Sequence, residues 1–231
     1  VRSQPVCILR KKNIQRQEGL KITRDKNIIL NSPNDKYVVV QELLQNPYIL
    51  NNRKINMRFY LLVICENNNI KGYVHKSGFM YYTRKPFKYN SIDIDPNITT
   101  GYIDRDVYVD NPLTLIQFKE HIDNKYSLGT SDMVFNNVYD ILKKTLLSAK
   151  NKLCKNNIIK ENYSFQLFGV DMALSDTLVP QLIEINKGPD MGSKSKEDGL
   201  LKYNVLKDMF SIVGGNEIMK CPSNNNFINI L

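Results

Sequence analysis

The sequence contains few of the side chains that build metal centres and cross-links. It has two histidines, His75 and His121, which are too few and too far apart for a histidine metal site or a catalytic dyad. The four cysteines are Cys7, Cys65, Cys154 and Cys221, and no two of them form a C-x-x-C motif. This scatter predicts reduced, buried thiols of an intracellular protein, and neither a disulfide framework nor a zinc site.

Long apolar runs are also missing. No run reaches the ~18 residues that a membrane span needs, so we expect no membrane partner. The start of the chain, VRSQP, does not resemble a signal peptide, and we expect a cytoplasmic protein. Because the first residue is not methionine, we expect a fragment of a longer protein. The 42% hydrophobic and 24% charged content is ordinary for one or two globular domains.

Acidic residues are in the minority. The chain has 32 Lys and Arg against 23 Asp and Glu, a net charge of +9. This charge favours an anionic partner such as a nucleotide, an acidic protein tail or a nucleic acid. Basic residues interleaved with aromatic ones, as in single-strand binders, do not occur, so nucleic acid is the least favoured of the three. The alternative is that the charge serves solubility alone.

Two apolar segments joined by a short polar turn stand out in the second half of the chain. Residues 165–174 and 178–186 predict two strands of a hairpin, with Ser175-Asp176-Thr177 as the turn. A hairpin centred between Thr177 and Leu178 pairs residues whose numbers sum to 355, which places Asp171 opposite Glu184. Cross-strand neighbours have Cβ atoms about 5 Å apart. Glu184 and Asn186 are two residues apart and therefore share a strand face.

These three polar side chains form a candidate cation site. Two carboxylates held together in a mostly apolar sheet repel one another and are costly to desolvate. Mg²⁺ resolves that conflict because it takes oxygen ligands, commonly one or two carboxylates together with phosphate and water. The alternative is a surface hairpin whose polar face is in water.

The same hairpin resembles a known family. The letters FGVD at residues 168–171 and LIEINKGP at residues 182–189 are similar to the metal-binding end of tubulin–tyrosine ligase-like enzymes, which belong to the ATP-grasp superfamily. The resemblance implies that Asp171, Glu184 and Asn186 hold the Mg²⁺ that bridges the phosphates of ATP.

A second match lies before the apolar segment 59–65. Lys54, Asn56 and Arg58 alternate and share one face of the predicted strand, which suits a phosphate or a carboxylate. The family pattern K-F-D-x-R is matched by Lys54 and Arg58, while Asn56 replaces the aspartate. The resemblance implies that Lys54 and Arg58 are catalytic cations and that Lys54 and Asn56 also contact the nucleotide. Since a cation on a polar strand face adds little packing, we expect Arg58→Ala to abolish turnover and leave the fold intact.

The remaining nucleotide contacts are implied by weaker matches. A strand, a glycine-containing loop and a second strand over residues 7–22 can place backbone N–H groups over phosphates, although a plain hairpin fits equally. Residues 37–44 match the family strand that hydrogen-bonds adenine, and a buried central strand is the alternative. At residues 99–100 the alternative to a nucleotide contact is that the two threonines only form a turn. The contacts implied by the resemblance are Arg10, Lys11, Gly19, Gln41, Glu42, Leu43, Leu44, Thr99 and Thr100.

The resemblance covers roughly residues 6–213 and lacks the family's N-terminal domain. It implies an α+β fold of the ATP-grasp type, an antiparallel sheet with packed helices and an ATP cleft between two sub-lobes. We expect residues 1–45 to be the remainder of the first lobe, 46–215 the second lobe with the catalytic core, and 216–231 a flexible tail. Helical spacing predicts helices over 113–123, from a cap at Ser131-Asp132 to 153, and over 197–213.

The implied activity is an ATP-dependent ligase. It would join a free amino acid to a carboxylate of an acidic, tubulin-like protein tail through an acyl-phosphate, as in tyrosination, glutamylation or glycylation. We expect Lys85, Lys88 and Arg105 to dock that tail. One alternative is another ATP-grasp ligase with a small substrate. The other is a non-catalytic nucleotide-binding or partner-binding module, which Tyr81 supports because the family has an arginine there.

Overall fold

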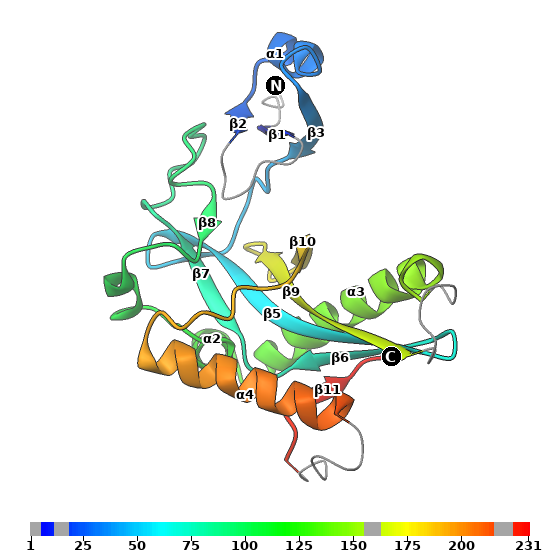
Figure 1. Cartoon of the computed structure of the whole chain (residues 1–231). Coiled ribbons are helices and arrows are strands. Elements are labelled where there is room, and N and C mark those ends of the chain that lie inside the picture. Colours follow the sequence, from blue (N-terminus) through cyan, green and yellow to red (C-terminus); the bar gives the residue numbers. More distant parts are fainter. Residues whose placement is uncertain (1–5, 12–18, 155–162, 215–223) are drawn as a thin grey trace. The chain divides into compact units, whose positions relative to one another are not determined.

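The computed structural model describes residues 6–11, 19–154, 163–214 and 224–231. Every strand pair whose register is defined within them is antiparallel. The strands are β1 Cys7–Lys11, β2 Leu20–Thr23, β3 Tyr37–Glu42, β4 Ile49–Leu50, β5 Arg53–Glu66, β6 Asn69–His75, β7 Phe79–Thr83, β8 Thr99–Thr100, β9 Tyr163–Leu174, β10 Pro180–Lys187 and β11 Phe227–Asn229. The helices are α1 Lys26–Asn31, α2 Leu115–Lys125, α3 Thr130–Leu153 and α4 Lys196–Val213, with a 3₁₀ turn at Arg105–Tyr108. The fold class is therefore α+β, as predicted (Figure 1).

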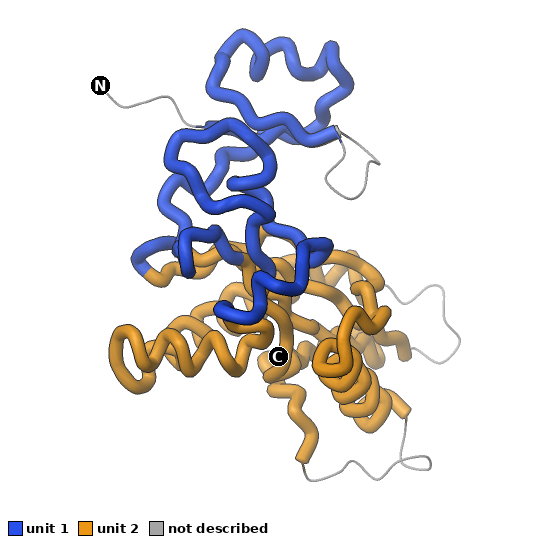
Figure 2. Tube along the Cα trace, turned by 90° about the vertical axis from the view of Figure 1, so that its left-hand side faces the viewer, with its two compact units in different colours: residues 1–55, 81–111, 175–177 blue, residues 56–80, 112–174, 178–231 orange. Residues whose placement is uncertain are grey.

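The chain divides into two compact units (Figure 2). Unit 1 comprises residues 1–55, 81–111 and 175–177, and unit 2 comprises 56–80, 112–174 and 178–231. Strands β5 and β7 each contribute to both units, because the division falls within them. The lobe boundary expected at residue 45 stays a prediction, and the two units are described separately below.

Unit 1 contains a three-stranded sheet in the order β2-β1-β3. Ile8 on β1 lies opposite Ile22 on β2 and Gln41 on β3. A small apolar core forms beneath it from Val6, Ile22 and Leu43, with Ile8, Ile94 and Ile98 packed against it. Elsewhere in unit 1, β4 pairs with the first residues of β5, and β8 pairs with the end of β7.

Strand β3 is not the buried central strand that its valines suggested as an alternative. Val38, Val39 and Val40 are 60%, 45% and 47% exposed. Among the described residues β3 pairs with β1 and lies at the edge of its sheet. Both faces of an edge strand can be solvated, so a β-branched run alone does not establish burial.

Unit 2 is built on a sheet path in the order β10-β9-β5-β6-β11. The register of β5 and β9 runs from Asn56 opposite Ala173 to Glu66 opposite Tyr163. Directly opposite residues of such a pair share a sheet face, and consecutive residues lie on opposite faces. The centre of β5 is apolar on both faces, which predicts a sheet covered on both sides.

The two long helices of unit 2 cover opposite faces of this sheet (Figure 1). Phe59 of β5 meets Phe135 of α3 edge-on, with ring centroids 5.5 Å apart. On the other face, Nε2 of His75 on β6 lies 3.2 Å from Oδ2 of Asp208 on α4. Arg58, next to Phe59 in sequence, therefore belongs to the α4 face.

The predicted helices are confirmed, but one of their caps is wrong. Helix α2 begins after Thr114, whose hydroxyl and Gln117 form a capping box. Helix α3 begins after Gly129 without a side-chain cap, so Ser131 does not cap it. The hydroxyl and amide of Ser131 instead donate to the carboxylate of Asp123, at 2.9 and 2.8 Å, which ties α3 to α2. The amide hydrogen bond from Ser131 lowers the pKa of Asp123.

The prediction of reduced thiols is wrong for two of the four cysteines. Cys65 at the end of β5 and Cys154 at the end of α3 form a disulfide, with their Cα atoms 5.3 Å apart. They are 89 residues apart in sequence, so spacing gave no sign that the two elements end side by side. Cys7 is half-buried, and burial raises the pKa of its thiol. Cys221 lies outside the described residues.

The end of the chain adds the last strand of the sheet. Phe227 of β11 lies opposite His75 of β6, within the segment 216–231 that the sequence predicted to be a flexible tail. The amide and the side chain of Asn226 both donate to Oδ2 of Asp208 on α4, at 3.0 and 2.9 Å. Asn225 also donates to the carbonyl of Asp208 at 2.9 Å, so two neighbouring asparagines are held by a buried residue of α4. The prediction of a flexible tail is therefore wrong for residues 224–231, and residues 216–223 lie outside the described residues.

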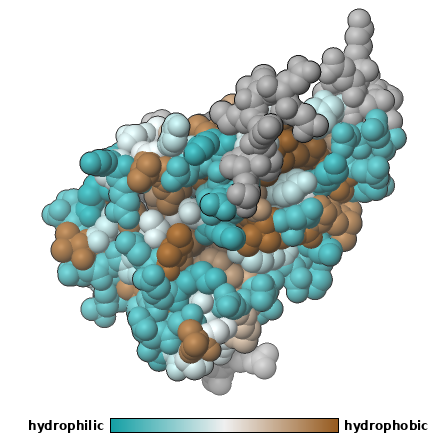
Figure 3. Space-filling view, turned by 90° about the horizontal axis from the view of Figure 1, so that it is seen from below, coloured by the Kyte–Doolittle hydropathy of each residue, from teal (hydrophilic) through white to brown (hydrophobic). Residues whose placement is uncertain are grey.

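The face of the molecule drawn in Figure 3 is mostly hydrophilic with separate hydrophobic areas. Helix α4 contributes Leu200, Tyr203 and Phe210, which are all more than half exposed. None of the helices among the described residues has the length and apolar character that crossing a membrane would require.

Candidate functional site

The centre of the candidate site is an ion pair between two neighbouring strands of unit 2. Arg58 of β5 lies directly opposite Asp171 of β9. Nε of Arg58 donates to Oδ1 of Asp171 at 2.6 Å, and Nη2 donates to Oδ2 at 2.9 Å. Both side chains are about nine-tenths buried. This two-pronged geometry is the strongest arrangement of a guanidinium and a carboxylate.

The third strand brings a second carboxylate to the same face. Glu184 of β10 lies directly opposite Asp171, so the predicted pairing of these two residues is confirmed. A bulge near Leu182 shifts the register by one residue between the turn and Glu184, and the predicted pairing holds on the far side of it. Nδ2 of Asn186 donates to Oε1 of Glu184 at 2.9 Å.

The electrostatics of this group are unbalanced. Burial raises the pKa of Asp171, Arg58 opposes that rise, and the carboxylate of Glu184 adds to it. The net direction is upward even though a guanidinium is bonded to both oxygens of Asp171. Two carboxylates therefore compete for one cation, and a second cation would relieve the competition.

An orphaned oxygen lies on the same sheet face. Asn56 precedes Arg58 by two residues on β5, and its Oδ1 is buried without a hydrogen-bond partner in the described structure. A buried acceptor without a donor is costly, and such atoms call for a ligand, an ion or water. Asp171, Glu184, Asn186 and this oxygen are a hard, all-oxygen donor set, which fits Mg²⁺. Within the described residues no three His, Cys, Asp or Glu side chains gather as a metal site, so the amides are essential to this one.

Gly169 makes room for the arginine. A Cβ at this position would lie 3.1 Å from Nη1 of Arg58 and 3.0 Å from Cβ of Pro189. A side chain at position 169 would therefore press on the guanidinium of Arg58 and on Pro189, and glycine leaves this space free. This packing accounts for the glycine of the FGVD sequence, and it places Pro189, from the loop that follows β10, beside Gly169.

Lys54 belongs to unit 1. It lies on β5 opposite Ile49 of β4 and is 6% exposed. Burial lowers its pKa to about 8. The charge of a buried lysine with a lowered pKa depends on its neighbours. An anion bound beside it would raise the pKa again and favour the protonated, charged form.

The other phosphate-contact residues predicted in unit 1 are only partly described. Arg10 and Lys11 are the last two residues of β1, and a register shift separates them where β1 pairs with β3. Gly19 has φ of +68°, which a glycine adopts without strain at the start of β2. The predicted phosphate loop between them, residues 12–18, lies outside the described residues.

The predicted adenine segment ends in a buried turn. Gln41 and Glu42 finish β3, and Leu43 and Leu44 follow it. The amide of Leu43 donates to the carbonyl of Val6 at 2.8 Å, and its carbonyl accepts a hydrogen bond from Nε2 of Gln45. Both backbone groups of Leu43 thus have partners within unit 1, and adenine recognition by this segment stays a prediction.

The two threonines are part of a turn in unit 1. Thr99 and Thr100 form β8, opposite Thr83 and Tyr82 of β7. Oγ1 of Thr100 accepts from the amide of Tyr102 at 3.0 Å, which is the turn chemistry that the sequence left open. Their nucleotide contacts stay a prediction.

The cations proposed to dock an acidic tail also lie in unit 1. Nζ of Lys85 is 3.3 Å from Oδ2 of Asp95, and the guanidinium of Arg105 lies 4.5 Å from the ring centroid of Tyr108. Lys88 is exposed. Each of these three would be accessible to an acidic chain within its own unit, and their role in docking is untested.

The structure thus brings four predicted residues together on the α4 face of unit 2: Arg58, Asp171, Glu184 and Asn186. Sequence reasoning missed the direct pairing of Arg58 with Asp171. It also missed the ion pair of Asp198 and Lys202, whose i,i+4 spacing on a predicted helix was a usable signal.

Comparison with known proteins shows the family of the chain and several relatives. A model described as the tubulin-tyrosine ligase family matches residues 2–222. The chain is 27% identical over 187 residues to the probable tubulin polyglutamylase TTLL9 of Rattus norvegicus, covering 78% of this chain and 39% of that protein. It is 28% identical over 186 residues to the probable tubulin polyglutamylase ttll-9 of Caenorhabditis elegans, covering 76% and 42%.

A more distant relative shows the same partial coverage. The probable alpha-tubulin polyglutamylase Ttll1 of Tetrahymena thermophila is 24% identical over 183 residues, covering 76% of this chain and 43% of that protein. The chain therefore spans about two fifths of the length of these three relatives.

Proposed function

The chain belongs to the tubulin-tyrosine ligase family, and we propose that it performs Mg²⁺- and ATP-dependent amide ligation. Its α+β fold of antiparallel sheets and packed helices agrees with the ATP-grasp fold of that family. The proposed reaction joins a free amino acid to a carboxylate of an acidic, tubulin-like tail in the cytoplasm. Among the amino acids left open by the sequence, glutamate is favoured because the relatives above are named as polyglutamylases.

One observation carries the proposal. Three adjacent strands of unit 2 place Arg58, Asp171, Glu184 and Asn186 on one sheet face, with more carboxylate charge than cationic charge. A purely structural ion pair would have no reason to include a second, half-buried carboxylate beside it. Transfer of a phosphoryl group, in contrast, depends on a carboxylate-bound divalent cation beside a fixed cation.

The residues take the following roles in the proposed reaction. Asp171, Glu184 and Asn186 would hold the cation through oxygen atoms, and the orphaned oxygen of Asn56 would accept a hydrogen bond from a bound water or nucleotide. When bound, Mg²⁺ neutralises charge on the transferring phosphoryl group. Arg58 holds Asp171 in a fixed rotamer, and its guanidinium stabilises developing negative charge beside it. Lys54 supplies a further cation when an anion raises its pKa again.

The proposed ligation proceeds in two steps. A carboxylate oxygen of the acceptor attacks the γ-phosphorus of ATP, the bond to the ADP oxygen breaks, and ADP leaves. The amine of the free amino acid then attacks the acyl carbon and loses a proton. Phosphate leaves with the electron pair of the broken carbon–oxygen bond, and an amide remains.

Two other functions remain possible outcomes of the tests. A ligase with a small substrate would use the same residues of unit 2 and differ only in the acceptor. A non-catalytic module would bind nucleotide without turnover, and Tyr81, which packs against Gly101 at the place of a family arginine, favours this outcome.

Glu184→Gln is the test of the metal assignment, carried out in the full-length protein. Loss of one of two carboxylates should weaken Mg²⁺–ATP binding by at least about tenfold, measured by calorimetry at fixed Mg²⁺. The matched control is Glu66→Gln on the same sheet, because Glu66 is exposed and paired with Lys71 far from the site. Equal affinities for the wild type and Glu184→Gln would refute the assignment.

ADP release separates the three functions. With glutamate and a glutamate-rich peptide, the proposed ligase releases ADP and the peptide gains mass by one residue. Release with two free amino acids and none with the peptide would establish the small-substrate ligase. Nucleotide binding without ADP release under either condition would establish the non-catalytic module.

A further inference from the structure

A second buried ion pair lies on helix α4, outside the residues assigned above. Nζ of Lys202 is 2.9 Å from Oδ2 of Asp198, and the two side chains are 6% and 5% exposed. Nζ also donates to the carbonyl of Gly192 at 2.6 Å and lies 5.5 Å from the ring centroid of Phe79. Lysine is rarely buried to this degree. An i,i+4 pair meant only to support its own helix is normally exposed and contributes little.

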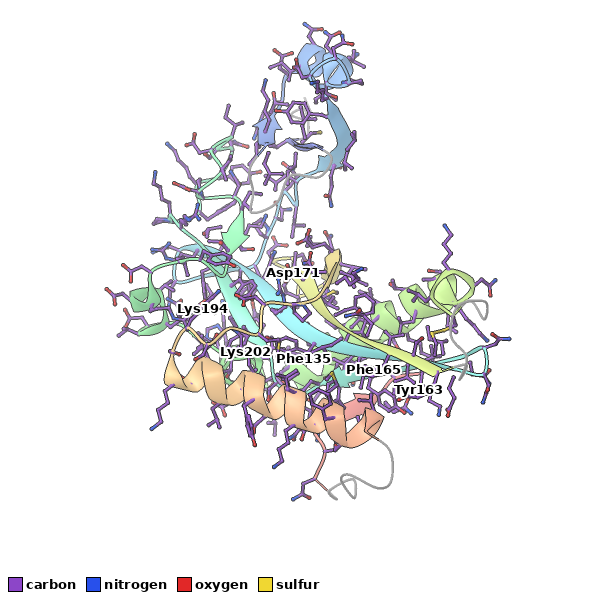
Figure 4. The ribbon with its side chains drawn as sticks, viewed as in Figure 1. Phe135, Tyr163, Phe165, Asp171, Lys194 and Lys202 are labelled. Carbon is purple, nitrogen blue, oxygen red and sulfur yellow. A yellow bond between two sulfur atoms is a disulfide. The ribbon has the colours of Figure 1, made fainter. Side chains whose placement is uncertain are left out.

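Asp198 holds the same loop through the oxygen atom that also pairs with Lys202. Oδ2 of Asp198 accepts from the amide of Lys194 at 3.0 Å. The amide of Asp198 is in turn capped by Oγ of Ser195 at 3.2 Å. The loop of residues 188–195, which connects β10 to α4, is thus bonded to the pair at Gly192 and Lys194. Figure 4 shows Lys194 and Lys202 beside this connection, with Asp171 on the neighbouring sheet.

The same loop is packed against the helix at a glycine. A Cβ on Gly199 of α4 would lie 2.6 Å from Oγ and 3.2 Å from Cβ of Ser193. Glycine within a helix is less favourable than alanine by about 1 kcal/mol, so the sequence keeps it here at a cost to the helix. The close approach of Ser193 is the reason that the structure gives.

The other end of the loop reaches the candidate site. Pro189, one of its first residues, lies against Gly169 of β9 next to the guanidinium of Arg58. Lys187, at the end of β10, is only three residues from Glu184. Lys202 is therefore bonded to the loop at Gly192, and three residues earlier the same loop places Pro189 beside the guanidinium that pairs with Asp171.

We propose that Lys202 is a positioning residue: with Asp198 it fixes the loop 188–195 so that Pro189 closes over Arg58 and Asp171 and β10 presents Glu184 and Asn186 at the spacing that Mg²⁺–ATP requires. The inference rests on the proposed function, and it assigns a role to a residue that touches neither metal nor nucleotide. Outer contacts of this kind commonly change metal affinity by about 10–100-fold.

The test uses variants of the full-length protein that separate the loop from the fold. Lys202→Met alone leaves Asp198 buried without its cation and risks unfolding. The main variant is therefore the double substitution Asp198→Asn with Lys202→Met, which removes both charges and keeps the side-chain volumes. Gly199→Ala is a second, independent variant, since it favours the helix and crowds Ser193. Lys202→Arg is the rescue variant, and Lys207→Met, exposed on the same helix, is the matched control.

Two readouts are needed. Hydrogen exchange of the loop amides, above all that of Lys194, should accelerate by at least about tenfold in the double variant and less in Gly199→Ala. The KM for Mg²⁺–ATP should rise by about tenfold in the double variant with kcat little changed, because ground-state binding is what the loop supports. Lys202→Arg should recover part of both effects, and Lys207→Met should show neither.

The outcomes distinguish this inference from the function it rests on. Fast loop exchange together with an unchanged KM in the double variant would overturn the positioning role while leaving the ligase proposal intact. Unchanged exchange would overturn it as well, because the pair would then not hold the loop. If the wild type shows no Mg²⁺–ATP binding, the proposed function has failed, and the positioning of a nucleotide site fails with it.

Discussion

The two ends of the paired strands β5 and β9 in unit 2 differ in what holds them. At one end Arg58 faces Asp171, both buried, with Glu184 as a second carboxylate alongside. At the other end Cys65 is joined to α3 by a disulfide, and the neighbouring Glu66 forms an exposed ion pair with Lys71 at 2.7 Å. The first end has a largely buried ion pair with a second, half-buried carboxylate beside it. The second end has a disulfide and a solvent-exposed ion pair.

The difference separates function from stability along one strand pair. A disulfide stabilises the folded chain whatever its surroundings, mainly by restricting the unfolded chain. Buried charge gives little net stability, and an excess of one sign gives less. The end with Arg58 is therefore expected to bind ligands, and the end with Cys65 is expected to maintain the fold. Substitutions at the two ends should separate these effects.

Arg58→Ala should have the largest effect on stability. Removing one partner of a buried pair typically costs about 3–5 kcal/mol, and here it leaves two carboxylates facing each other. This differs from the expectation, drawn from the sequence, that the fold would be indifferent to the change. Urea denaturation measures the loss. Adding Asp171→Asn should recover much of it, and a double variant as unstable as Arg58→Ala would mean that lost packing, not stranded charge, is responsible.

Cys65→Ser should be the next largest change, with the opposite selectivity. Loss of a disulfide costs about 2–4 kcal/mol in free energy of unfolding. Because the bond lies at the far end of the strands from Arg58, Mg²⁺–ATP affinity should not change. Thermal unfolding with and without reductant measures this loss of stability. Reductant should lower the unfolding midpoint of the wild type and leave that of the variant unchanged. Equal midpoints for the wild type in both conditions would mean that the disulfide does not stabilise the fold.

The site was predictable where its contacts are local. The hairpin of residues 165–186 has its turn and alternating pattern in one continuous segment, so the pairing of Asp171 with Glu184 could be read from it. The helices were predictable for the same reason, because their apolar spacing is local. The cap of α3 was not, since Ser131 is used by Asp123 of the neighbouring helix.

The contacts that the sequence did not reveal are distant ones. Arg58 and Asp171 are 113 residues apart, and their meeting depends on which strands become neighbours in the sheet. Cys65 and Cys154 depend on the same sheet order and on the length of α3. The exposure of Val39 depends on where its strand ends up in a sheet, which a β-branched run does not specify.

Lys54, earlier on β5 and in unit 1, should have a smaller effect. It should make stability and nucleotide affinity change with pH in opposite directions. Burial lowers its pKa to about 8 from 10.5. The folded state therefore binds fewer protons than the unfolded state between these pH values, so Lys54 makes stability rise with pH across that window. If its charge binds phosphate, nucleotide affinity should fall by up to about tenfold per pH unit above 8. Lys54→Gln should abolish both slopes in parallel titrations of unfolding and of ATP binding. A slope in affinity that persists in the variant would belong to another group.

Glu66→Gln should have the smallest effect, and it tests the comparison most directly. Glu66 and Lys71 are 43% and 46% exposed, so their ion pair contributes about 0–1 kcal/mol and weakens as salt is added. Its hydrogen bond to Glu66 raises the pKa of Lys71, so the contribution is present at neutral pH and disappears as pH rises through that pKa. The measurement is a set of urea titrations at low and high salt, with Mg²⁺–ATP affinity determined on the same samples. Because Glu66 and Glu184 belong to the same sheet and receive the same substitution, they differ only in burial and in neighbours. A loss of nucleotide affinity in Glu66→Gln as large as that in Glu184→Gln would mean that the two ends of the strand pair are not functionally distinct.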